Sequence, residues 1–233
     1  MISIVVPALN EAANLRRLLP ALAAQAWPHE ILVVDGGSAD DTQAVARALG
    51  ARVLEAPPSR GGQIAAGAAC ARGDALWFLH ADSDVPPGAL AAIGQTLAGD
   101  RASPGGNFRL LFDGERPFDR WLEGFYARLR TRGIYYGDSG VFVRASVYRA
   151  LGGMPDLALM EDFAFVRRLE RAGRTRCIAE PPLRTSSRRF VGRSKISIVA
   201  GWLAIHALYA LGLDARALAR LYRSDRGARC ADI

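Results

Sequence analysis

The chain opens with the stretch Ile2-Ser3-Ile4-Val5-Val6-Pro7-Ala8-Leu9-Asn10-Glu11, an apolar run that ends in a polar turn. The same pattern returns at residues 30–35 (EILVVD), 52–55 (RVLE) and 75–79 (ALWFL). Between these runs, apolar and small residues recur at helical spacing, over residues 11–25, 38–49 and 62–72. Strands that alternate with helices in this way predict βαβ units. We therefore expect an α/β fold with a mostly parallel sheet and helices on both faces.

Acidic and polar residues follow the predicted strands where each strand ends. The first strand runs into Pro7–Glu11, the second ends at Asp35, and the fourth is followed by Asp82 and Asp84. Parallel sheets bind their ligands beyond the carboxyl ends of the strands. We therefore expect these groups to share one site at that edge of the sheet.

The rest of the chain is less regular. Residues 99–136 are rich in glycine, arginine and aromatic residues, and predict loops plus one helix over 117–132. The turn Gly137-Asp138-Ser139-Gly140 precedes a short apolar run over 141–143, which predicts a strand. Met160-Glu161-Asp162 opens a further helical pattern, so two carboxylates are expected in its first turn.

Composition limits the class of protein. Half of the 233 residues are apolar and 23% are charged, which supports a sizeable core and excludes a disordered chain. The net charge of +7 would suit nucleic acid, an anionic membrane or a phosphorylated substrate. Three widely spaced cysteines argue against a disulfide framework or a structural zinc site, and favour a reduced, cytoplasmic protein. The first residues lack the basic region and longer apolar run of a signal peptide.

Five short motifs, in this order, resemble the signatures of the family 2 glycosyltransferases, which have the GT-A fold. They are residues 4–11, 33–42, 60–63 (RGGQ), 80–82 (HAD) and 161–162 (ED). The resemblance covers about residues 2–190. The RGGQ element and the Gly137–Gly140 turn also resemble a bacterial subgroup often labelled as arsenosugar-biosynthesis-type glycosyltransferases.

The resemblance implies a reaction and a set of residues for it. A sugar would move from a UDP- or GDP-sugar, with UDP favoured, to a hydroxyl of a small-molecule or lipid acceptor. Mg²⁺ or Mn²⁺ would neutralise the departing diphosphate, held by carboxylates at Asp82 and Asp84. Asp162 resembles the catalytic base, which takes the proton of the acceptor hydroxyl. A single displacement by that hydroxyl would invert the anomeric centre. Glu161 would tune this site or bind the acceptor.

The donor-binding set follows the same motifs. The Pro7–Leu9 backbone would line the nucleoside, Asp35 would read the base, and Arg60 would lie against the base or the diphosphate. Arg188 and Arg189 resemble a segment that closes over the diphosphate, although a solvated basic loop would look the same. The complete predicted set is Pro7, Ala8, Leu9, Glu11, Asp35, Arg60, Gln63, His80, Ala81, Asp82, Arg188 and Arg189.

One position departs from the family pattern. The family usually has aspartate where this chain has His80. Histidine can ligate a metal or bond to ribose, but it does not supply the same charge. Asp84 either compensates for the missing carboxylate or only caps the loop before Pro86-Pro87.

We divide the chain into a catalytic domain over residues 1–190 and a helical C-terminal extension over 191–233. Residues 196–213 form an eighteen-residue run without a formally charged side chain, about 27 Å long as a helix. Basic and apolar residues alternate after it. The extension would lie at an anionic membrane surface over residues 191–223, or pack on the domain or in a homodimer, or, least well, span a membrane. The first reading places the protein at the inner face of the plasma membrane.

Two rival functions remain open. A nucleotidyltransferase also pairs an α/β sheet with a carboxylate-held metal, but it should carry a basic, glycine-rich loop directly after the first strand, where this chain has Pro7–Glu11. A non-catalytic module that binds sugar nucleotides or membranes is supported only by His80. We expect no nucleic-acid partner, because no nucleic-acid-binding motif is present and the arginines cluster near the diphosphate motif and the extension.

Overall fold

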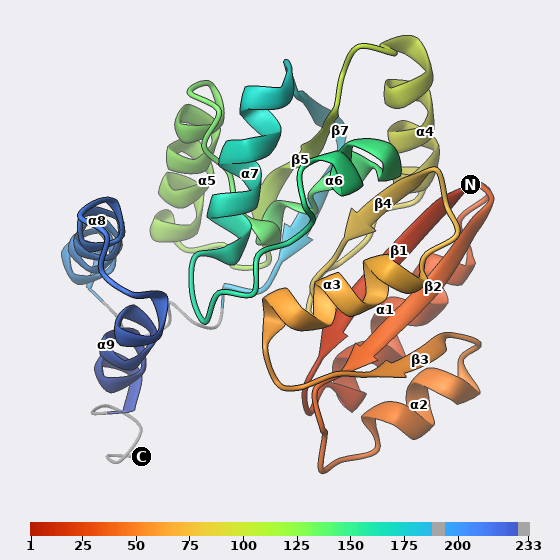
Figure 1. Cartoon of the computed structure of the whole chain (residues 1–233), viewed down its shortest axis with the longest axis horizontal. Coiled ribbons are helices and arrows are strands. Elements are labelled where there is room, and N and C mark those ends of the chain that lie inside the picture. The colour runs from red at the N-terminus through yellow and green to blue at the C-terminus, as the bar shows by residue number, and fades with distance from the viewer. Residues whose placement is uncertain (188–193, 228–233) are drawn as a thin grey trace.

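The structure is a computed structural model that describes residues 1–187 and 194–227. Its described residues form a seven-stranded sheet in the order β3-β2-β1-β4-β6-β5-β7 (Figure 1). Only β6 runs antiparallel to its neighbours, so the prediction of a mostly parallel sheet is confirmed. The strands are β1 (Ile2–Ala8), β2 (His29–Asp35), β3 (Arg52–Glu55), β4 (Ala75–Phe78), β5 (Gly105–Phe112), β6 (Phe142–Arg144) and β7 (Arg176–Thr185).

Helices cover both faces of the sheet, as expected. One core layer joins the sheet to α1, α2 and α4, and the other joins it to α3, α6 and α7. Neighbouring residues of β1 belong to opposite layers: Ile4 to the first and Val5 to the second. Burial on both faces explains why the strand is a continuous apolar run. The helices are α1 (Ala12–Ala23), α2 (Thr42–Ala48), α3 (Arg60–Cys70), α4 (Ala89–Gly99), α5 (Pro117–Arg130), α6 (Ala145–Ala150), α7 (Glu161–Ala172), α8 (Lys195–Ala210) and α9 (Ala215–Gly227).

The stretch from 99 to 136 is more regular than its sequence indicates. It contains β5, which pairs with β6 and β7. A Cβ atom at Gly105 would lie 2.2 Å from the Phe142 carbonyl oxygen, and one at Gly106 would lie 1.9 Å from that of Arg176. The two glycines therefore permit a close approach between strands, although glycine in a sequence usually indicates a break.

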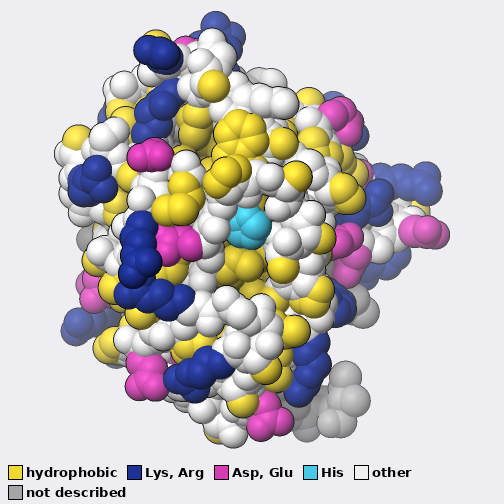
Figure 2. All heavy atoms as spheres, turned by 90° about the vertical axis from the view of Figure 1, so that its right-hand side faces the viewer, with side chains coloured by type: hydrophobic (Ala, Val, Ile, Leu, Met, Phe, Trp, Pro, Cys, Tyr) yellow, Lys and Arg dark blue, Asp and Glu magenta, His cyan; other side chains and the backbone are white. Residues whose placement is uncertain are grey.

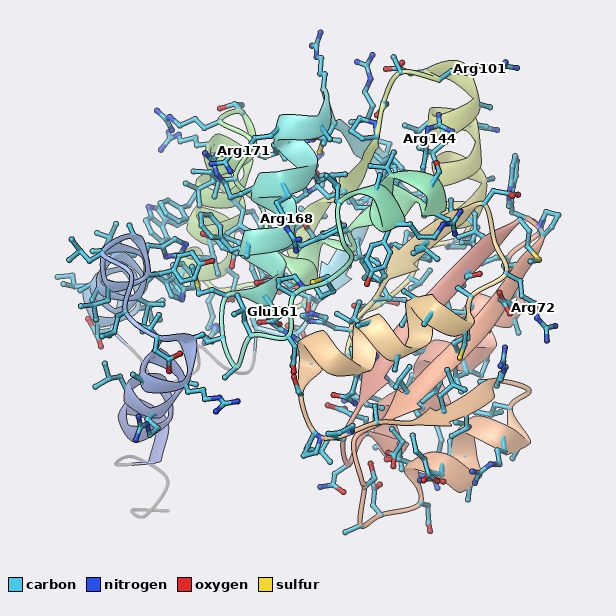
Figure 3. All side chains as sticks on the ribbon, viewed as in Figure 1. Arg72, Arg101, Arg144, Glu161, Arg168 and Arg171 are labelled. Atoms are coloured by element: carbon cyan, nitrogen blue, oxygen red, sulfur yellow. The ribbon has the colours of Figure 1, made fainter. Side chains whose placement is uncertain are left out.

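Several arginines form hydrogen bonds within the protein that stabilise the fold. Arg144 donates to the carbonyl oxygens of Leu97 and Asp100, at 2.6 and 3.0 Å. Arg168 on α7 donates to the carbonyls of Leu151 and Gly153, both at 2.8 Å (Figure 3). On the face turned toward the viewer in Figure 2, acidic side chains lie among the basic ones. Part of the positive charge is thus structural, and the visible face carries no continuous basic stripe among its described residues.

The C-terminal extension folds into two helices that lie at one side of the molecule (Figure 1). α8 ends at Ala210, and the turn after it contains Gly212 at φ +83°. Ile198 and Trp202 pack against the cluster formed by β5 and α5. Among the described residues, no helix combines the length and apolar character needed to cross a membrane. The boundary at residue 190 stays a prediction.

Candidate active site

A pocket of about 470 Å³, here called pocket A, lies at the carboxyl ends of β1 and β4. Its walls contain every described residue of the predicted donor-binding set except Asp35. Thr185, the last residue of β7, and Ser186 complete it. The lining is Pro7, Ala8, Leu9, Glu11, Arg60, Gln63, His80, Ala81, Asp82, Thr185 and Ser186.

The loops after β1 and β2 are held together by hydrogen bonds. The Asn10 amide donates to the Ser38 hydroxyl, and the Ala39 amide donates to the Asn10 side chain, both at 2.8 Å. The Glu11 amide donates to the Thr42 hydroxyl, also at 2.8 Å. Asn10 adopts φ +56°, a left-handed conformation that asparagine tolerates better than most residues. These contacts fix the edge of pocket A before any ligand binds.

Asp35 lies beneath this edge rather than on the wall of pocket A. It is fully buried, and its carboxylate accepts hydrogen bonds from the Gly37 and Ser38 amides and from Gln43. Burial raises the pKa of Asp35, but these donors outweigh it and hold the pKa below its usual range. In the structure, Asp35 stabilises the loop after β2. Its role in reading the base stays a prediction.

Gln63 of α3 joins β1 to β2 at the floor of pocket A. Its side-chain amide donates to the carbonyl oxygens of Ala8 and Val34, at 2.9 and 2.7 Å. Both carbonyls lie near strand ends, and that of Ala8 also accepts the Gly36 amide at 2.9 Å. The glutamine of the RGGQ element therefore adds a side-chain link between the ends of the two strands.

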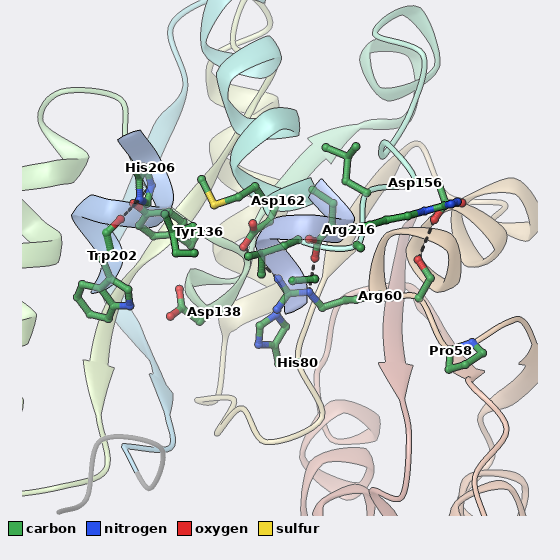
Figure 4. Close-up of a pocket in the computed structure, with 18 of the residues that line it drawn as sticks. Pro58, Arg60, His80, Tyr136, Asp138, Asp156, Asp162, Trp202, His206 and Arg216 are labelled. Atoms are coloured by element: carbon green, nitrogen blue, oxygen red, sulfur yellow. Dashed lines mark hydrogen bonds and ion pairs between the residues drawn. The ribbon is translucent and has the colours of Figure 1, made fainter. Parts of the chain in front are cut away.

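A second pocket of about 570 Å³, here called pocket B, lies beside pocket A (Figure 4). Arg60 and His80 line both pockets. The C-terminal helices form part of its wall, with Trp202 and His206 from α8 and Arg216 from α9. Its remaining lining comes from residues 58–59, 126, 136, 138, 156–162, 205 and 219.

The two carboxylates at the start of α7 share one arginine. Arg60 donates to Glu161, and a guanidinium nitrogen of Arg60 lies 3.6 Å from Asp162 Oδ2 (Figure 4). The Gly137 amide donates to Oδ2 at 2.9 Å, and the Phe163 amide donates to Oδ1 at 2.7 Å. Asp162 is therefore held from two sides at the bottom of pocket B.

The two carboxylates differ in their acidity. Burial raises the pKa of Asp162, but Arg60, the Gly137 and Phe163 amides and His80 outweigh it, so its pKa lies below the usual value. For Glu161, burial and the neighbouring Asp162 outweigh Arg60, so its pKa is raised. Separated pKa values in a carboxylate pair are typical of distinct chemical roles. The directions of the two shifts favour ionisation of Asp162 over ionisation of Glu161.

The backbone places this pair by an unusual conformation. Met160, at the start of α7, adopts φ +67°, which is rare for a residue with a side chain. The turn directs Glu161 and Asp162 into the first turn of the helix, where the partial positive charge of the helix end favours carboxylates. Such backbone outliers are concentrated at functional sites.

A comparison with protein families identifies the chain. The family model described as "Glycosyl transferase family 2" matches residues 3–150. The chain belongs to this family. A family 2 glycosyltransferase was the prediction made from the five motifs, and it is confirmed. The family assignment leaves the nucleotidyltransferase hypothesis without support.

Individual relatives resemble parts of the chain. Glucosyl-3-phosphoglycerate synthase from Mycobacterium tuberculosis is 35% identical over 92 residues, which cover 35% of this chain and 28% of that protein. Undecaprenyl-phosphate 4-deoxy-4-formamido-L-arabinose transferase from Sodalis glossinidius is 31% identical over 216 residues, covering 85% of this chain and 63% of that one. The chain thus spans less than two thirds of either curated relative.

Solved structures confirm the GT-A fold. The M. tuberculosis synthase, crystallised with Mn²⁺, UDP and glucosyl-3-phosphoglycerate, matches with a TM-score of 0.64 at 19% identity, over 91% of this chain and 80% of that one. The mannosyltransferase PcManGT from Pyrobaculum calidifontis, in complex with GDP-Man and Mn²⁺, gives 0.65 at 21% identity, over 89% and 61%. At these identities the likeness establishes the fold alone.

The predicted metal ligands are only partly brought together in this chain. Asp82 lines pocket A beside His80, whereas Asp84 is exposed and lines none of the described pockets. The Asp84 backbone instead pairs with Arg184. No group of three or more metal-ligating side chains occurs among the described residues. Mg²⁺ is commonly held by one or two carboxylates together with substrate phosphates, so Asp82 fits a metal that binds with the donor.

Arg188 and Arg189 lie outside the described residues. The chain just before them is firmly held. The Ser187 amide donates to Asp113 at 2.7 Å, and Arg116 donates to the Ser187 hydroxyl at 3.2 Å. Since Ser186 lines pocket A, these contacts fix the last described residues of this stretch at the pocket.

Sequence reasoning missed several contacts in and around pocket B. Gly137 stood out as part of a turn, but the sequence gives no sign that its amide bonds to Asp162. The Tyr136 hydroxyl lies 2.9 Å from His206 Nε2, and the other ring nitrogen of His206 lies 2.8 Å from the Trp202 carbonyl. A carbonyl can only accept, so His206 Nδ1 carries a proton, and in the neutral ring Tyr136 donates to Nε2. The signal available in the sequence was His206, a polar residue within the apolar run of residues 196–213.

Proposed function

We propose that the chain is a metal-dependent, inverting glycosyltransferase. It moves a sugar from a UDP- or GDP-sugar in pocket A to a hydroxyl of a small-molecule or lipid acceptor in pocket B. The observation that carries the proposal is the position of Asp162. This carboxylate has a lowered pKa and lies where two pockets meet, with Arg60 and His80 lining both.

Pocket A suits the nucleotide end of a donor. Residues Pro7–Leu9 line one part of the pocket, and the loop that follows them is fixed by the hydrogen bonds of Asn10. Asp82 and His80 line another part. GT-A relatives in this comparison were crystallised with UDP and with GDP-Man, which supports a nucleoside diphosphate sugar in this pocket.

Mg²⁺ or Mn²⁺, when bound, would neutralise the negative charge that develops on the departing diphosphate. Asp82 would hold the ion from the protein side, and His80 is close enough in the chain to bond to it or to ribose. Asp84 remains a candidate ligand only if the segment that carries it moves. The Mn²⁺ complexes of both structural relatives support this cofactor.

Asp162 performs the proton transfer in this proposal. Its Oδ2 is occupied by the Gly137 amide and by Arg60, whereas Oδ1 accepts the Phe163 amide and keeps a second lone pair. An acceptor hydroxyl in pocket B can therefore give its proton to Oδ1 as its oxygen attacks the sugar. Attack from the side opposite the departing diphosphate inverts the anomeric centre. Glu161 holds Arg60 in place.

The acceptor class rests on the walls of pocket B. The lining combines aromatic rings at Tyr126, Tyr136 and Trp202 with carboxylates that include Asp162, which suits a molecule with one hydroxylated and one apolar part. The S. glossinidius relative is named for a lipid phosphate acceptor, and the M. tuberculosis synthase for a small phosphorylated one. Both classes remain within the proposal. The bacterial subgroup, the homodimer and the cytoplasmic location stay predictions.

Calorimetric titration with UDP-glucose and GDP-mannose, each with Mn²⁺ and with EDTA, tests the proposal. We expect one donor to bind with Mn²⁺ and to weaken at least about tenfold with EDTA. Asp82→Asn should abolish this difference, and Asp84→Asn should preserve it, because Asp84 does not line pocket A. Equal binding with and without metal in the unmodified chain would contradict a metal held at Asp82.

A further inference from the structure

α8 is apolar around its whole circumference, yet half of that circumference is exposed. One row of residues, Ile198, Trp202, Ile205 and Tyr209, faces the protein, and Ile198 is only 2% exposed. The opposite row leaves Ile196 80% exposed and Leu203 66% exposed. A helix that is apolar on all sides is normally buried on all sides. The outer row of α8 therefore exposes apolar side chains that are normally buried.

The exposed row continues beyond the helix. Leu211 at the turn after α8 is 83% exposed and Leu213 is 39% exposed. We call this surface the outer patch, formed by Ile196, Ala200, Leu203, Ala204, Ala207, Leu211 and Leu213. The residues recur at the spacing of one helix face, so they form a continuous stripe. Isolated exposed leucines are ordinary, but a continuous stripe marks an interaction surface.

Aromatic rings connect the catalytic domain to α8. Trp121 on α5 is 41% exposed and stacks on Phe125, with ring centroids 5.3 Å apart. Phe125 in turn stacks on Trp202 of α8 at 6.2 Å. Exposed tryptophan beside apolar surface is typical of the boundary between water and a lipid bilayer.

A cationic side chain accompanies this apolar surface. α9 buries Leu218 and Ala219 and exposes Arg220, whereas Arg216 lines pocket B. Asp214, at the start of α9, is the acidic residue of the turn, and its carboxylate is engaged by the Arg216 and Ala217 amides. An apolar stripe beside exposed arginines is the composition of segments that lie in the surface of an anionic membrane.

We propose that the outer patch and Arg220 of α9 bind an anionic lipid surface, with α8 lying in the plane of that surface. A second copy of the chain is the alternative cover. A two-fold dimer through the patch would bring the α9 arginines at position 220 of both copies toward the same interface. Lipid phosphates would neutralise those arginines while the acyl region covers the leucines. Charge complementarity therefore favours the membrane.

This attachment also bears on the acceptor. The inner side of α8 contributes Trp202, Ile205 and His206 to pocket B. The same helix thus contacts the lipid surface on one side and the acceptor pocket on the other. If the proposed function holds, an acceptor dissolved in the membrane would have a short path to Asp162. The surface binding itself does not depend on transfer, so either proposal can fail without the other.

Vesicle co-sedimentation of the full chain tests the proposal. The vesicles contain phosphatidylcholine alone or with 30% phosphatidylglycerol, a composition of about one anionic lipid in three. We expect the anionic vesicles to bind the unmodified chain more than about tenfold better. The double variant Leu203→Glu/Leu211→Glu should lower binding by about 100-fold or more, because two leucines that the acyl region would cover are replaced by charged side chains. Leu49→Glu, at an exposed leucine after α2, is the matched control and should bind within about twofold of the unmodified chain.

A second variant guards against misfolding. Arg220→Ala leaves the apolar patch intact and should weaken binding to anionic vesicles about fivefold, with unchanged binding to neutral ones. Light scattering measures the oligomeric state in parallel. Unmodified chain that ignores both vesicle types, or a double variant that binds as the unmodified chain does, would overturn the proposal. A dimer that the double variant converts to monomers, without vesicle binding, would assign the patch to a second copy.

Discussion

In the candidate site, one arginine interacts with two neighbouring carboxylates. Arg60 bonds to Glu161, which is 2% exposed, and approaches Asp162 at 3.6 Å. Two adjacent carboxylates near one cation cannot both be fully compensated, so one pKa rises and the other falls. The geometry favours ionisation of Asp162, because it also accepts two backbone amides. In the proposed mechanism, Arg60 and the two amides together make Asp162 the acid that acts as the base.

Removing the charge of Arg60 should move the pH dependence of catalysis. In the unmodified chain the pKa of Asp162 is lowered, so the base stays ionised until the pH falls well below neutrality. In Arg60→Gln the effect of burial is no longer outweighed. The acidic limb of the kcat/KM profile should then move to higher pH, as measured by donor turnover across a pH series.

Arg60→Lys provides the control for this experiment. It keeps the positive charge but loses the planar guanidinium. Its profile should lie between those of the unmodified chain and Arg60→Gln, even if its kcat is low. Profiles that coincide for all three proteins would show that Arg60 does not control the ionisation of the base.

At the scale of single elements, the parallel half of the sheet could be predicted and the other half could not. Strands such as β1 and β4 are buried on both faces, so their apolar runs are unambiguous. β5 begins with two glycines, and β7 includes two prolines, so both resemble loops in sequence. Their strand character comes from neighbours that are distant in the chain.

The candidate site divides in the same way. Pocket A was predictable because its residues follow successive parallel strands, which must end at one edge. Pocket B was not, because its walls join α7, the Gly137 turn and α8, which only tertiary packing brings together. Asp162 could be named from its motif, but its partner at Gly137 could not.

Two glycines in helices should respond in opposite ways to alanine. A Cβ at Gly67 of α3 would lie 2.4 Å from Val5 Cγ1 and 2.9 Å from Val34 Cγ2, so Gly67→Ala should cost about 1–3 kcal/mol. A Cβ at Gly124 of α5 would meet no atom within 4 Å, so Gly124→Ala should add about 0.5–1 kcal/mol. Urea denaturation measures both free energies of unfolding. A stable Gly67→Ala would contradict the close packing of α3 on the sheet.

The bond between Tyr136 and His206 should tie α8 to acceptor binding. Tyr136→Phe removes the hydroxyl that donates to the histidine, at a cost of about 1 kcal/mol. We expect KM for the acceptor to rise about fivefold, with donor affinity unchanged. Tyr209→Phe, on α8 like His206, is the matched control. It should leave the KM for the acceptor and the donor affinity near those of the unmodified chain. An equal loss of donor affinity in Tyr136→Phe would indicate a general disturbance instead.

Over the whole molecule, donor binding should stabilise the fold and depend on metal. The loop after β1 lines pocket A and is hydrogen-bonded to the loop after β2, so a ligand there would stabilise this edge of the sheet. A donor at one hundred times its dissociation constant adds about 2.7 kcal/mol, which raises Tm by about 5–10 °C in a chain of this size. Thermal melting with Mn²⁺ should show this rise, and EDTA should reduce it. A rise that EDTA leaves intact would argue for metal-independent binding.

The central claim is that Asp162 is the base of an inverting sugar transfer. The most direct test follows single-turnover transfer from the donor by NMR in Asp162→Asn, with Asp74→Asn, an exposed residue far from the pockets, as control. We predict product of inverted anomeric configuration from the unmodified chain and the control. Asp162→Asn should transfer about 10²–10⁴-fold more slowly, with donor affinity nearly intact. Unchanged transfer by Asp162→Asn, or product that retains the donor configuration, would contradict the account.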